Sequence, residues 1–445
     1  MGRRSHSQTL GIWANGERVG RWTIPARGDM EVQYDEAWVR SGLGRPLSLS
    51  LPFNPYNEPI KGDAVAHYFD NLLPDSDAIR RRVAARFKTG STEAFELLQA
   101  IGRDCVGAIQ LLNESEQPSN LDQVDAVPLD ALAVEQHLLD VVVPDSLGAA
   151  TESDDDFRTS LAGAQEKDAY LWWNGSWHKP RGSTPTTHIF KLPLGLVGGR
   201  RADFSTSVDN EWLCLKLLRA YGLPAAEASI ASFGSQRVLV VERFDRRLAG
   251  GRLLRLPQED FCQATGTSPL LKYENEGGPG LRKLFALLQQ SRNAQSDMQT
   301  LMAAQVLFWL LRAPDGHAKN FSIHLLPGGA FQLTPMYDVM SAYPIIGNGP
   351  NLWPRHDVKM AMALLGKNRH YHMETIQRRH FNSTAQMVGF SSDAETIVQD
   401  LIEKTPEVIA NAQRKLPADF SQKVLDSVLG GLEQAVARLG DMPAR

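Results

Sequence analysis

Cysteine is scarce in this chain, and long apolar runs are missing from it. The three cysteines, Cys105, Cys214 and Cys262, lie far apart in apolar surroundings and form no Cys-x-x-Cys pair. This spacing does not suit a disulfide framework and fits a reducing cytoplasm. No stretch approaches the ~18 apolar residues of a membrane span, and no apolar segment follows the charges of the first seven residues. We therefore expect a cytoplasmic protein that is neither secreted nor membrane-spanning.

A strong excess of charge of one sign is also absent. The formal net charge of the 445 residues is −4, so the chain has no global basic field. Any contact with nucleic acid must then be local or made through a partner. Apolar residues make up 42% of the chain and charged residues 22%, which is typical of a soluble globular protein. The length predicts two or three domains.

The most informative stretch is Arg312-Ala-Pro-Asp-Gly-His-Ala-Lys-Asn-Phe-Ser322, which follows a long apolar helical pattern. In phosphoryl transfer to a hydroxyl, an Asp at the position of Asp315 accepts the proton of the nucleophile. An Asn five residues later, here Asn320, holds a magnesium ion that bridges nucleotide phosphates. Asp338 would complete an oxygen cluster suited to Mg²⁺. Asp-Gly and Asn also form turns, so a plain turn fits this spacing as well.

A second cluster begins with a loop of small residues, Ser160-Leu-Ala-Gly-Ala-Gln-Glu-Lys167. Small side chains let backbone N–H groups approach phosphate oxygens, although an ordinary surface loop fits a segment with one glycine. Lys191 lies in an apolar strand, where its charge must either pair or reach solvent. Glu211, near the start of a helix that Ser207 would cap, offers a partner. In protein kinases a strand Lys pairs with a helix Glu while it binds the nucleotide phosphates; an exposed lysine at the strand end is the alternative.

A strand predicted over Gln236–Glu242 stands where a kinase chain passes from its small lobe to its large lobe. The backbone of Glu242 and Phe244 could bind adenine there, with the Phe ring packed on it; a strand that simply ends at the surface is the alternative. The segment 296–311 is apolar at nearly every position, so we expect a buried helix that holds the Asp315 loop rigid. Further helical patterns cover 259–265, 280–291, 372–381, 393–403, 406–416 and 422–439.

Residues 1–113 predict a small α+β domain. Its hairpin turns at Asn15-Gly16 in a type I′ turn, and another strand is expected over Pro46–Leu51. Residues 114–156 predict a linker with an amphipathic helix and the acidic run Thr151–Asp156. A β-rich lobe over 157–247 and a helical lobe over 248–445 follow. Within these segments the predicted helices cover 64–72, 77–86, 92–101 and 129–142, and a further strand covers 106–112.

Together these signals run in the order of a kinase chain, and over nearly its whole length the sequence resembles the HipA family. These proteins are serine/threonine-kinase toxins of bacterial toxin–antitoxin modules. The resemblance implies a bilobal protein-kinase-like α+β fold with a β-rich N-lobe, an all-helical C-lobe and a small N-terminal α+β subdomain that contacts the antitoxin. The matching segments are Leu47–Pro52, Tyr68–Ser76, Asp156–Lys167, Pro185–Pro193, Glu242–Arg247, Leu256–Asp260, Asp315–Ser322 and Tyr337-Asp338.

The resemblance also implies roles for individual residues. Asp315 would be the catalytic base, and Asn320 and Asp338 would hold Mg²⁺. In this family a serine at the position of Ser160 is autophosphorylated, which expels the phosphate loop and inactivates the kinase. A phosphoserine adds a charge of about −1.5 to −2, which the acidic run would repel. The residues implied in ATP binding are Ala162, Gly163, Ala164, Gln165, Glu166, Lys167, Lys191, Glu242, Arg243, Phe244, His317, Lys319, Asn320, Tyr337 and Asp338.

The partners implied by the resemblance are a helix-turn-helix antitoxin (HipB-like) dimer and, through that complex, operator DNA, on which the toxin acts as a co-repressor. The implied protein substrate is a translation component such as an aminoacyl-tRNA synthetase, whose phosphorylation causes growth arrest and persistence. The protein would be cytoplasmic, and nucleoid-associated when it is bound to the antitoxin. Arg378 and Arg379 could contact DNA phosphates, although residues of this kind more often form a solvated basic face.

Two departures from eukaryotic kinases stand out. Val339-Met340 follow Asp338, so there is no Asp-Phe-Gly triplet, and Ala313-Pro314 replace the His-Arg that precedes the catalytic Asp of those enzymes. One alternative function is a small-molecule or lipid phosphotransferase, because it would use the same Asp-x₄-Asn chemistry. Another is a co-repressor scaffold that mainly binds the antitoxin and DNA. The intact set of Lys, Asp and Asn residues argues against a pure pseudokinase.

Overall fold

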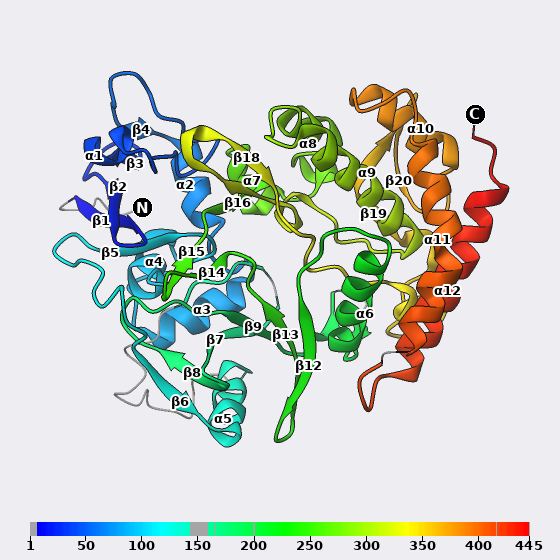
Figure 1. The fold of residues 1–445 in the computed structure, drawn as a ribbon, viewed down its shortest axis with the longest axis horizontal. Helices are drawn as coiled ribbons and strands as arrows, with labels where there is room; N and C mark the ends of the chain where they lie inside the picture. Colours follow the sequence, from blue (N-terminus) through cyan, green and yellow to red (C-terminus); the bar gives the residue numbers. More distant parts are fainter. Residues whose placement is uncertain (1–6, 143–158, 164, 199–200, 415, 445) are drawn as a thin grey trace.

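The structure is a computed structural model that describes residues 7–142, 159–163, 165–198, 201–414 and 416–444. Figure 1 shows the N-terminal domain at one end of the molecule and the long C-terminal helices at the other. A second sheet is formed by the part of the sequence that lies between them. Ala164 and the acidic run Thr151–Asp156 lie outside the described residues. Within the described ranges, no helix has both the length and the apolar character needed to cross a membrane.

One antiparallel sheet organises the N-terminal domain, with strand order β4-β3-β2-β1-β5. The first hairpin closes at Asn15 and Gly16, whose φ angles of 49° and 91° agree with the predicted type I′ turn. In the core, the ring of Trp22 stacks on Phe69 with 3.8 Å between centroids. The elements are β1 (Gln8–Ala14), β2 (Glu17–Ile24), β3 (Glu31–Tyr34), α1 (Glu36–Arg40), β4 (Ile60–Lys61), α2 (Asp63–Asp70), α3 (Asp77–Arg86), α4 (Ala94–Ile101) and β5 (Ile109–Asn113).

The predicted strand over Pro46–Leu51 is not formed. Its polar groups are bound by the C-lobe instead: Leu49 donates its backbone N–H to Glu259 Oε1 at 2.9 Å, and the Ser50 hydroxyl donates to the Gln263 carbonyl at 2.7 Å. Because these contacts satisfy the segment without a ladder of strand hydrogen bonds, it docks the N-terminal domain onto the C-lobe as an irregular loop.

The second sheet has six antiparallel strands in the order β12-β13-β9-β7-β8-β6. The segment 114–156, predicted as a linker, supplies both β6 and the helix α5, which packs Val134 and Leu138 against Tyr170 and Phe190 of the sheet. This part of the segment therefore belongs to the sheet layer. The elements are β6 (Ala126–Leu129), α5 (Ala131–Val142), β7 (Lys167–Trp173), β8 (Ser176–Pro180), β9 (His188–Lys191), β10 (Gly195–Val197), β11 (Ala202–Phe204), α6 (Ser207–Ala220), β12 (Ala228–Phe233) and β13 (Gln236–Glu242).

Helix α9 is the buried centre of the C-lobe, as its apolar sequence predicts, and Leu301, Leu307 and Leu310 on it are fully buried. The segments predicted as two helices at 393–403 and 406–416 form one helix, α11, with Pro406 inside it. The helix packs against α6, α9 and α12, and it buries Leu401 before this proline and Val408 after it. The helices are α7 (Phe261–Ala264), α8 (Leu281–Leu288), α9 (Ala294–Leu310), α10 (Arg378–Met387), α11 (Glu395–Arg414) and α12 (Gln422–Asp441).

The C-lobe is mainly helical, but it is not all-helical as predicted. One hairpin occupies the chain before α10, so the helix predicted over 372–381 begins only at Arg378. The first strand of this hairpin, β19, buries the continuous run Met360–Leu365. It therefore has no exposed face of polar residues that would have marked it as a strand in the sequence. The strands are β14 (Arg246–Ala249), β15 (Arg252–Arg255), β16 (Gln258–Asp260), β17 (Ser322–Leu325), β18 (Phe331–Leu333), β19 (Lys359–Leu365) and β20 (Arg369–His372).

We predict that Leu307→Ala lowers the free energy of unfolding by about 2–5 kcal/mol, because it leaves a cavity in the packing around α9. Leu132→Ala is the matched control, since Leu132 lies on helix α5 with 73% of its surface exposed, and it should change stability by about 0.5 kcal/mol or less. Urea titration of both variants measures the difference. Equal stability of the two variants would contradict the placement of α9 in the core.

Candidate nucleotide and catalytic site

A cavity of about 190 Å³ opens between the six-stranded sheet and the C-lobe, with one wall from the N-terminal domain. It contains most of the residues that the sequence predicts for nucleotide and metal binding. Those that line it are Ala162, Gly163, Gln165, Lys167, Lys191, Glu242, Arg243, Phe244, Asp315, His317, Lys319, Asn320, Tyr337 and Asp338. Ala164 lies outside the described residues, and Glu166 is directed elsewhere.

Lys191, at the end of β9, is the central charge of this cavity. Its Nζ donates to Glu211 Oε1 at 2.6 Å and to Asp338 Oδ1 at 2.9 Å, so the predicted pair of strand Lys and helix Glu is present. Burial alone would lower the pKa of Lys191, but the carboxylates of Asp338 and Glu211 raise it above its ordinary value. Burial would raise the pKa of Asp338, yet Lys191 and Lys167 hold it well below its usual range. The ammonium and the Asp338 carboxylate therefore both stay charged near neutral pH.

The loop predicted to bind phosphate, residues 162–167, is held by the N-terminal domain and by a contact within the loop. Gly163 has a φ of 108°, and its carbonyl accepts a hydrogen bond from the Asp75 N–H of the N-terminal domain at 3.0 Å. Lys167 Nζ donates to the Ala162 carbonyl at 2.6 Å. The positive φ favours glycine at position 163, and a Cβ there would lie 2.6 Å from the Lys167 ammonium, which would have to shift. Burial and the nearby Lys191 lower the pKa of Lys167 to about 8.

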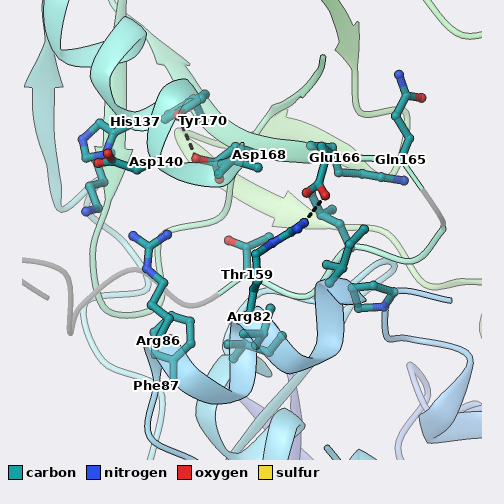
Figure 2. A pocket seen from close by; sticks show the side chains of 18 residues that line it. Arg82, Arg86, Phe87, His137, Asp140, Thr159, Gln165, Glu166, Asp168 and Tyr170 are labelled. Atoms are coloured by element: carbon teal, nitrogen blue, oxygen red, sulfur yellow. Dashed lines mark hydrogen bonds and ion pairs between the residues drawn. The ribbon is translucent and has the colours of Figure 1, made fainter. Parts of the chain in front are cut away.

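Glu166 lies on the opposite side of this loop from the nucleotide cavity. Its carboxylate accepts a hydrogen bond from Arg82 of α3. Figure 2 shows this pair in direct contact in the lining of a second cavity, where Tyr170 donates to Asp168. The Glu166 side chain therefore does not line the nucleotide cavity and links the loop to the N-terminal domain, and its contact with ATP stays a prediction.

The segment after α9 arranges the predicted base and metal ligand around one tight turn. Asn320 Nδ2 donates to the backbone carbonyl of Asp315 at 2.8 Å, which leaves the Asn320 carbonyl oxygen as the atom for an ion. Gly316 is needed because a Cβ there would lie 2.5 Å from the ring of Phe308 on α9. Tyr273, a residue that the sequence reading did not select, donates its hydroxyl to Asp315 Oδ1.

The donor set fits a magnesium ion that a nucleotide brings with it. Asn320 and Asp338 both line the cavity, and Asp338 has a φ of 57°, a strained angle that a non-glycine residue rarely adopts. Among the described residues no cluster of three or more His, Cys, Asp or Glu side chains forms a separate metal centre. Mg²⁺ is commonly held by one or two protein oxygens together with phosphates, and these residues could supply that part of its coordination.

Lys319 is buried and points toward the N-terminal domain. Its Nζ donates to Asn71 Oδ1 at 2.8 Å and lies 3.5 Å from carboxylate oxygens of both Asp75 and Asp260. Burial would lower the pKa of Lys319, but Asp260 and Asp75 raise it. The sequence reading missed Asn71 and Asp75, whose polar side chains stand in the otherwise apolar run Asn71-Leu-Leu-Pro-Asp75.

Arg243 borders the cavity, but its guanidinium is held in a buried ionic network. It donates to Asp245 Oδ1 at 2.9 Å and to Thr186 Oγ1 at 2.9 Å, and Asp104 lies 3.4 Å away. The guanidinium is therefore occupied by these partners, and the contact of Arg243 with ATP stays a prediction. The neighbouring Phe244 packs its ring beside Tyr337, with 5.7 Å between centroids.

His317 and Ser160 are both buried but lie in different places. His317 lines the cavity, and burial lowers its pKa. The Ser160 hydroxyl donates to the carbonyl of Leu72 at 2.8 Å, facing the N-terminal domain. Phosphorylation of Ser160 therefore requires this segment to leave its place.

Arg378 does not offer a free cation for DNA, because it pairs with Glu395 with only 12% of its side chain exposed. Arg379, its neighbour at the start of α10, is exposed. Of the two predicted DNA contacts, only Arg379 is therefore open to a phosphate.

A bilobal fold that gathers a paired Lys and Glu, the end of strand β13 and an Asp-x₄-Asn loop around one cavity is typical of a protein kinase. Residues 159–409 match the family described as HipA-like C-terminal domain, and residues 10–112 match the HipA N-terminal domain. The chain belongs to the HipA family of serine/threonine-protein kinase toxins.

Curated relatives cover most of the chain. The kinase Y4mE of Sinorhizobium fredii is 35% identical over 344 residues, which are 76% of this chain and 78% of that protein. The serine/threonine-protein kinase toxin HipA of Shewanella oneidensis is 29% identical over 371 residues, 80% of this chain and 78% of its own. A solved Shewanella oneidensis complex of HipA, HipB and operator DNA has the same fold, with a TM-score of 0.77, 22% identity, and coverage of 96% of this chain and 97% of that one.

We predict that nucleotide binding at pH 8 takes up about half a proton, because Lys167, with a pKa of about 8, is half protonated there and phosphate oxygens raise the pKa of a nearby ammonium. Calorimetric titration with Mg-ATP in buffers of different ionisation enthalpy measures this uptake. The uptake should fade below pH 7, where Lys167 is already protonated, and should be lost in Lys167→Met. Equal uptake in that variant would exclude Lys167 as the titrating group.

Proposed function

We propose that this protein transfers the γ-phosphoryl group of Mg-ATP to serine or threonine hydroxyls of proteins. The observation that carries the proposal is the position of Lys191 between Glu211 and Asp338, at 2.6 and 2.9 Å, in the same cavity as Asp315 and Asn320. When it is bound, Mg-ATP supplies the phosphoryl group and the metal charge that stabilises transfer. The protein's residues supply positions, counter-charges and a proton acceptor.

Lys191 exchanges partners in this proposal. Asp338 and Asn320 would hold the magnesium ion, and the Lys191 ammonium would pair with the phosphates while it keeps Glu211 as its counter-ion. A buried ammonium that kept no carboxylate would be costly to desolvate. Asp315 would accept the proton of the acceptor hydroxyl, and the backbone of Glu242–Phe244 would hold the adenine.

The proposal extends to self-inactivation. Ser160 is the proposed autophosphorylation site, and it is buried against Leu72, so a phosphate there could not return to the same place. The expelled segment would carry Gly163 and Lys167 out of the cavity and so remove the phosphate contacts.

The proposed partners are an antitoxin and, through it, operator DNA. The support is the likeness in fold to the chain from the Shewanella oneidensis HipA, HipB and operator DNA complex, together with the family membership. We infer the same arrangement for this chain, with cytoplasmic localisation and nucleoid association in the complex. An aminoacyl-tRNA synthetase is the proposed substrate, on the strength of the family resemblance.

Incubation with Mg-ATP followed by phosphate mapping by mass spectrometry tests the proposal. We expect phosphate on Ser160 in the wild type and none in Asp315→Asn, which keeps the side-chain shape but cannot accept the proton. Ser160→Ala should remain active for longer, because it cannot inactivate itself. The proposal fails if a wild-type sample that starts unphosphorylated and binds nucleotide incorporates no phosphate.

A further inference from the structure

A segment between α7 and α8 borders the catalytic loop without a role in the function proposed above. We call residues 268–280 the strap. It contains Leu271-Lys-Tyr-Glu-Asn-Glu-Gly-Gly-Pro-Gly280, with short 3₁₀ turns at Pro269–Leu271 and Glu274–Glu276. The strap is tied to the catalytic loop through its backbone, because Ala318 donates its N–H to the carbonyl of Lys272 at 3.3 Å.

Three consecutive side chains of the strap reach three different parts of the molecule. Lys272 Nζ pairs with Asp75 Oδ2 of the N-terminal domain at 2.8 Å. Glu274 Oε2 accepts a hydrogen bond from the Ala363 N–H of β19 at 2.6 Å. Tyr273, between them, donates its hydroxyl to Asp315 Oδ1. The contacts of Lys272 and Glu274, on either side, hold Tyr273 beside the Asp315 carboxylate.

The glycines at the end of the strap allow this close fold. A Cβ at Gly278 would lie 2.0 Å from the carbonyl oxygen of Leu271, and one at Gly280 would lie 2.2 Å from the carboxyl carbon of Glu274. Gly278 also donates its N–H to the Tyr273 carbonyl at 2.9 Å. The strap therefore returns tightly on itself and holds Tyr273 from its backbone as well as from its neighbours.

The two oxygens of the Asp315 carboxylate have different surroundings. Tyr273 donates to Oδ1, and His317 Nε2 lies 3.6 Å from the same atom, with the two rings perpendicular at 89° and 4.8 Å between centroids. In the part of the chain that the structure describes, no hydrogen bond reaches Oδ2. Tyr273 is not among the described residues that line the nucleotide cavity, whereas Asp315 is. The hydroxyl therefore approaches the carboxylate from outside the cavity and leaves Oδ2 for a group inside it.

We propose that Tyr273 is a positioning residue of the kinase reaction, whose hydroxyl fixes Oδ1 of Asp315 and so aims Oδ2 at the acceptor hydroxyl. The inference rests on the proposed role of Asp315 as the base. A carboxylate rotates about its bond to Cβ, and proton acceptance requires one oxygen within hydrogen-bond distance of the acceptor. Fixing the other oxygen removes that rotational freedom before the substrate binds.

The test compares Tyr273→Phe with the wild type in the full-length protein, by the rate of ³²P incorporation from Mg-[γ-³²P]ATP. Phenylalanine keeps the ring that packs on His317 and removes only the hydroxyl. We expect the rate at saturating Mg-ATP to fall about 10- to 100-fold, as for loss of a hydrogen bond to a charged group. The KM for ATP and the melting temperature should stay within about twofold and about 2 °C of the wild type, because the hydroxyl touches neither the nucleotide nor the core.

Tyr221→Phe is the matched control. It removes the hydroxyl of a buried tyrosine, which bonds Thr405 Oγ1 at 2.7 Å, and Tyr221 does not line the cavity. This variant should lower the melting temperature and leave the rate unchanged, the opposite pattern from Tyr273→Phe.

Each other outcome overturns the inference in a distinct way. An unchanged rate in Tyr273→Phe would show that Asp315 does not need the hydroxyl to be oriented. A faster rate would show that the hydroxyl inhibits Asp315. A lower melting temperature together with a raised KM would make the role merely structural. If the wild type incorporates no phosphate at all, the assignment of Asp315 as the base falls as well, which separates that failure from one confined to Tyr273.

Discussion

A buried ammonium that must be neutralised is the constraint on which the site depends. Lys191 has only 8% of its side chain exposed, and an unpaired charge at such depth would cost several kcal/mol. Two carboxylates from distant parts of the chain therefore have to meet it: Glu211 from α6 and Asp338 from the loop after β18. This requirement fixes where α6 lies on the sheet and brings the C-lobe loop to the end of β9.

The N-terminal domain is part of the same construction. It receives Lys319 on Asn71, pairs Asp75 with Lys272, and binds the phosphate loop through the carbonyl of Gly163. A second buried ionic network, centred on Asp104, ties that domain to Arg243, Arg246 and Arg255 after strand β13. A displacement of the N-terminal domain would therefore break contacts to the Asp315 loop, to Gly163 and to the segment after β13 together.

The pairs that could be predicted from sequence are those that burial forces. A lysine in an apolar strand followed by an acidic residue in a buried helix leaves few arrangements, and so Lys191 and Glu211 could be paired in advance. The direction of a side chain could not be predicted where adjacent residues point opposite ways. Lys167 lines the nucleotide cavity, while Glu166 beside it pairs with Arg82. Tyr273 could not be selected from the sequence because its hydrogen bond reaches Asp315, 42 positions away in the chain, and no local pattern marks it.

The central claim is that the charge of Lys191 is held ready for the nucleotide phosphates. Its most direct test is a calorimetric titration of Mg-ATP into Lys191→Met/Glu211→Gln, a pair that removes the lysine without leaving the Glu211 carboxylate unpaired. We expect a folded protein whose affinity for Mg-ATP is lower by about tenfold or more, while the exposed control Lys283→Met binds as the wild type does. Wild-type affinity in the double variant would contradict the account.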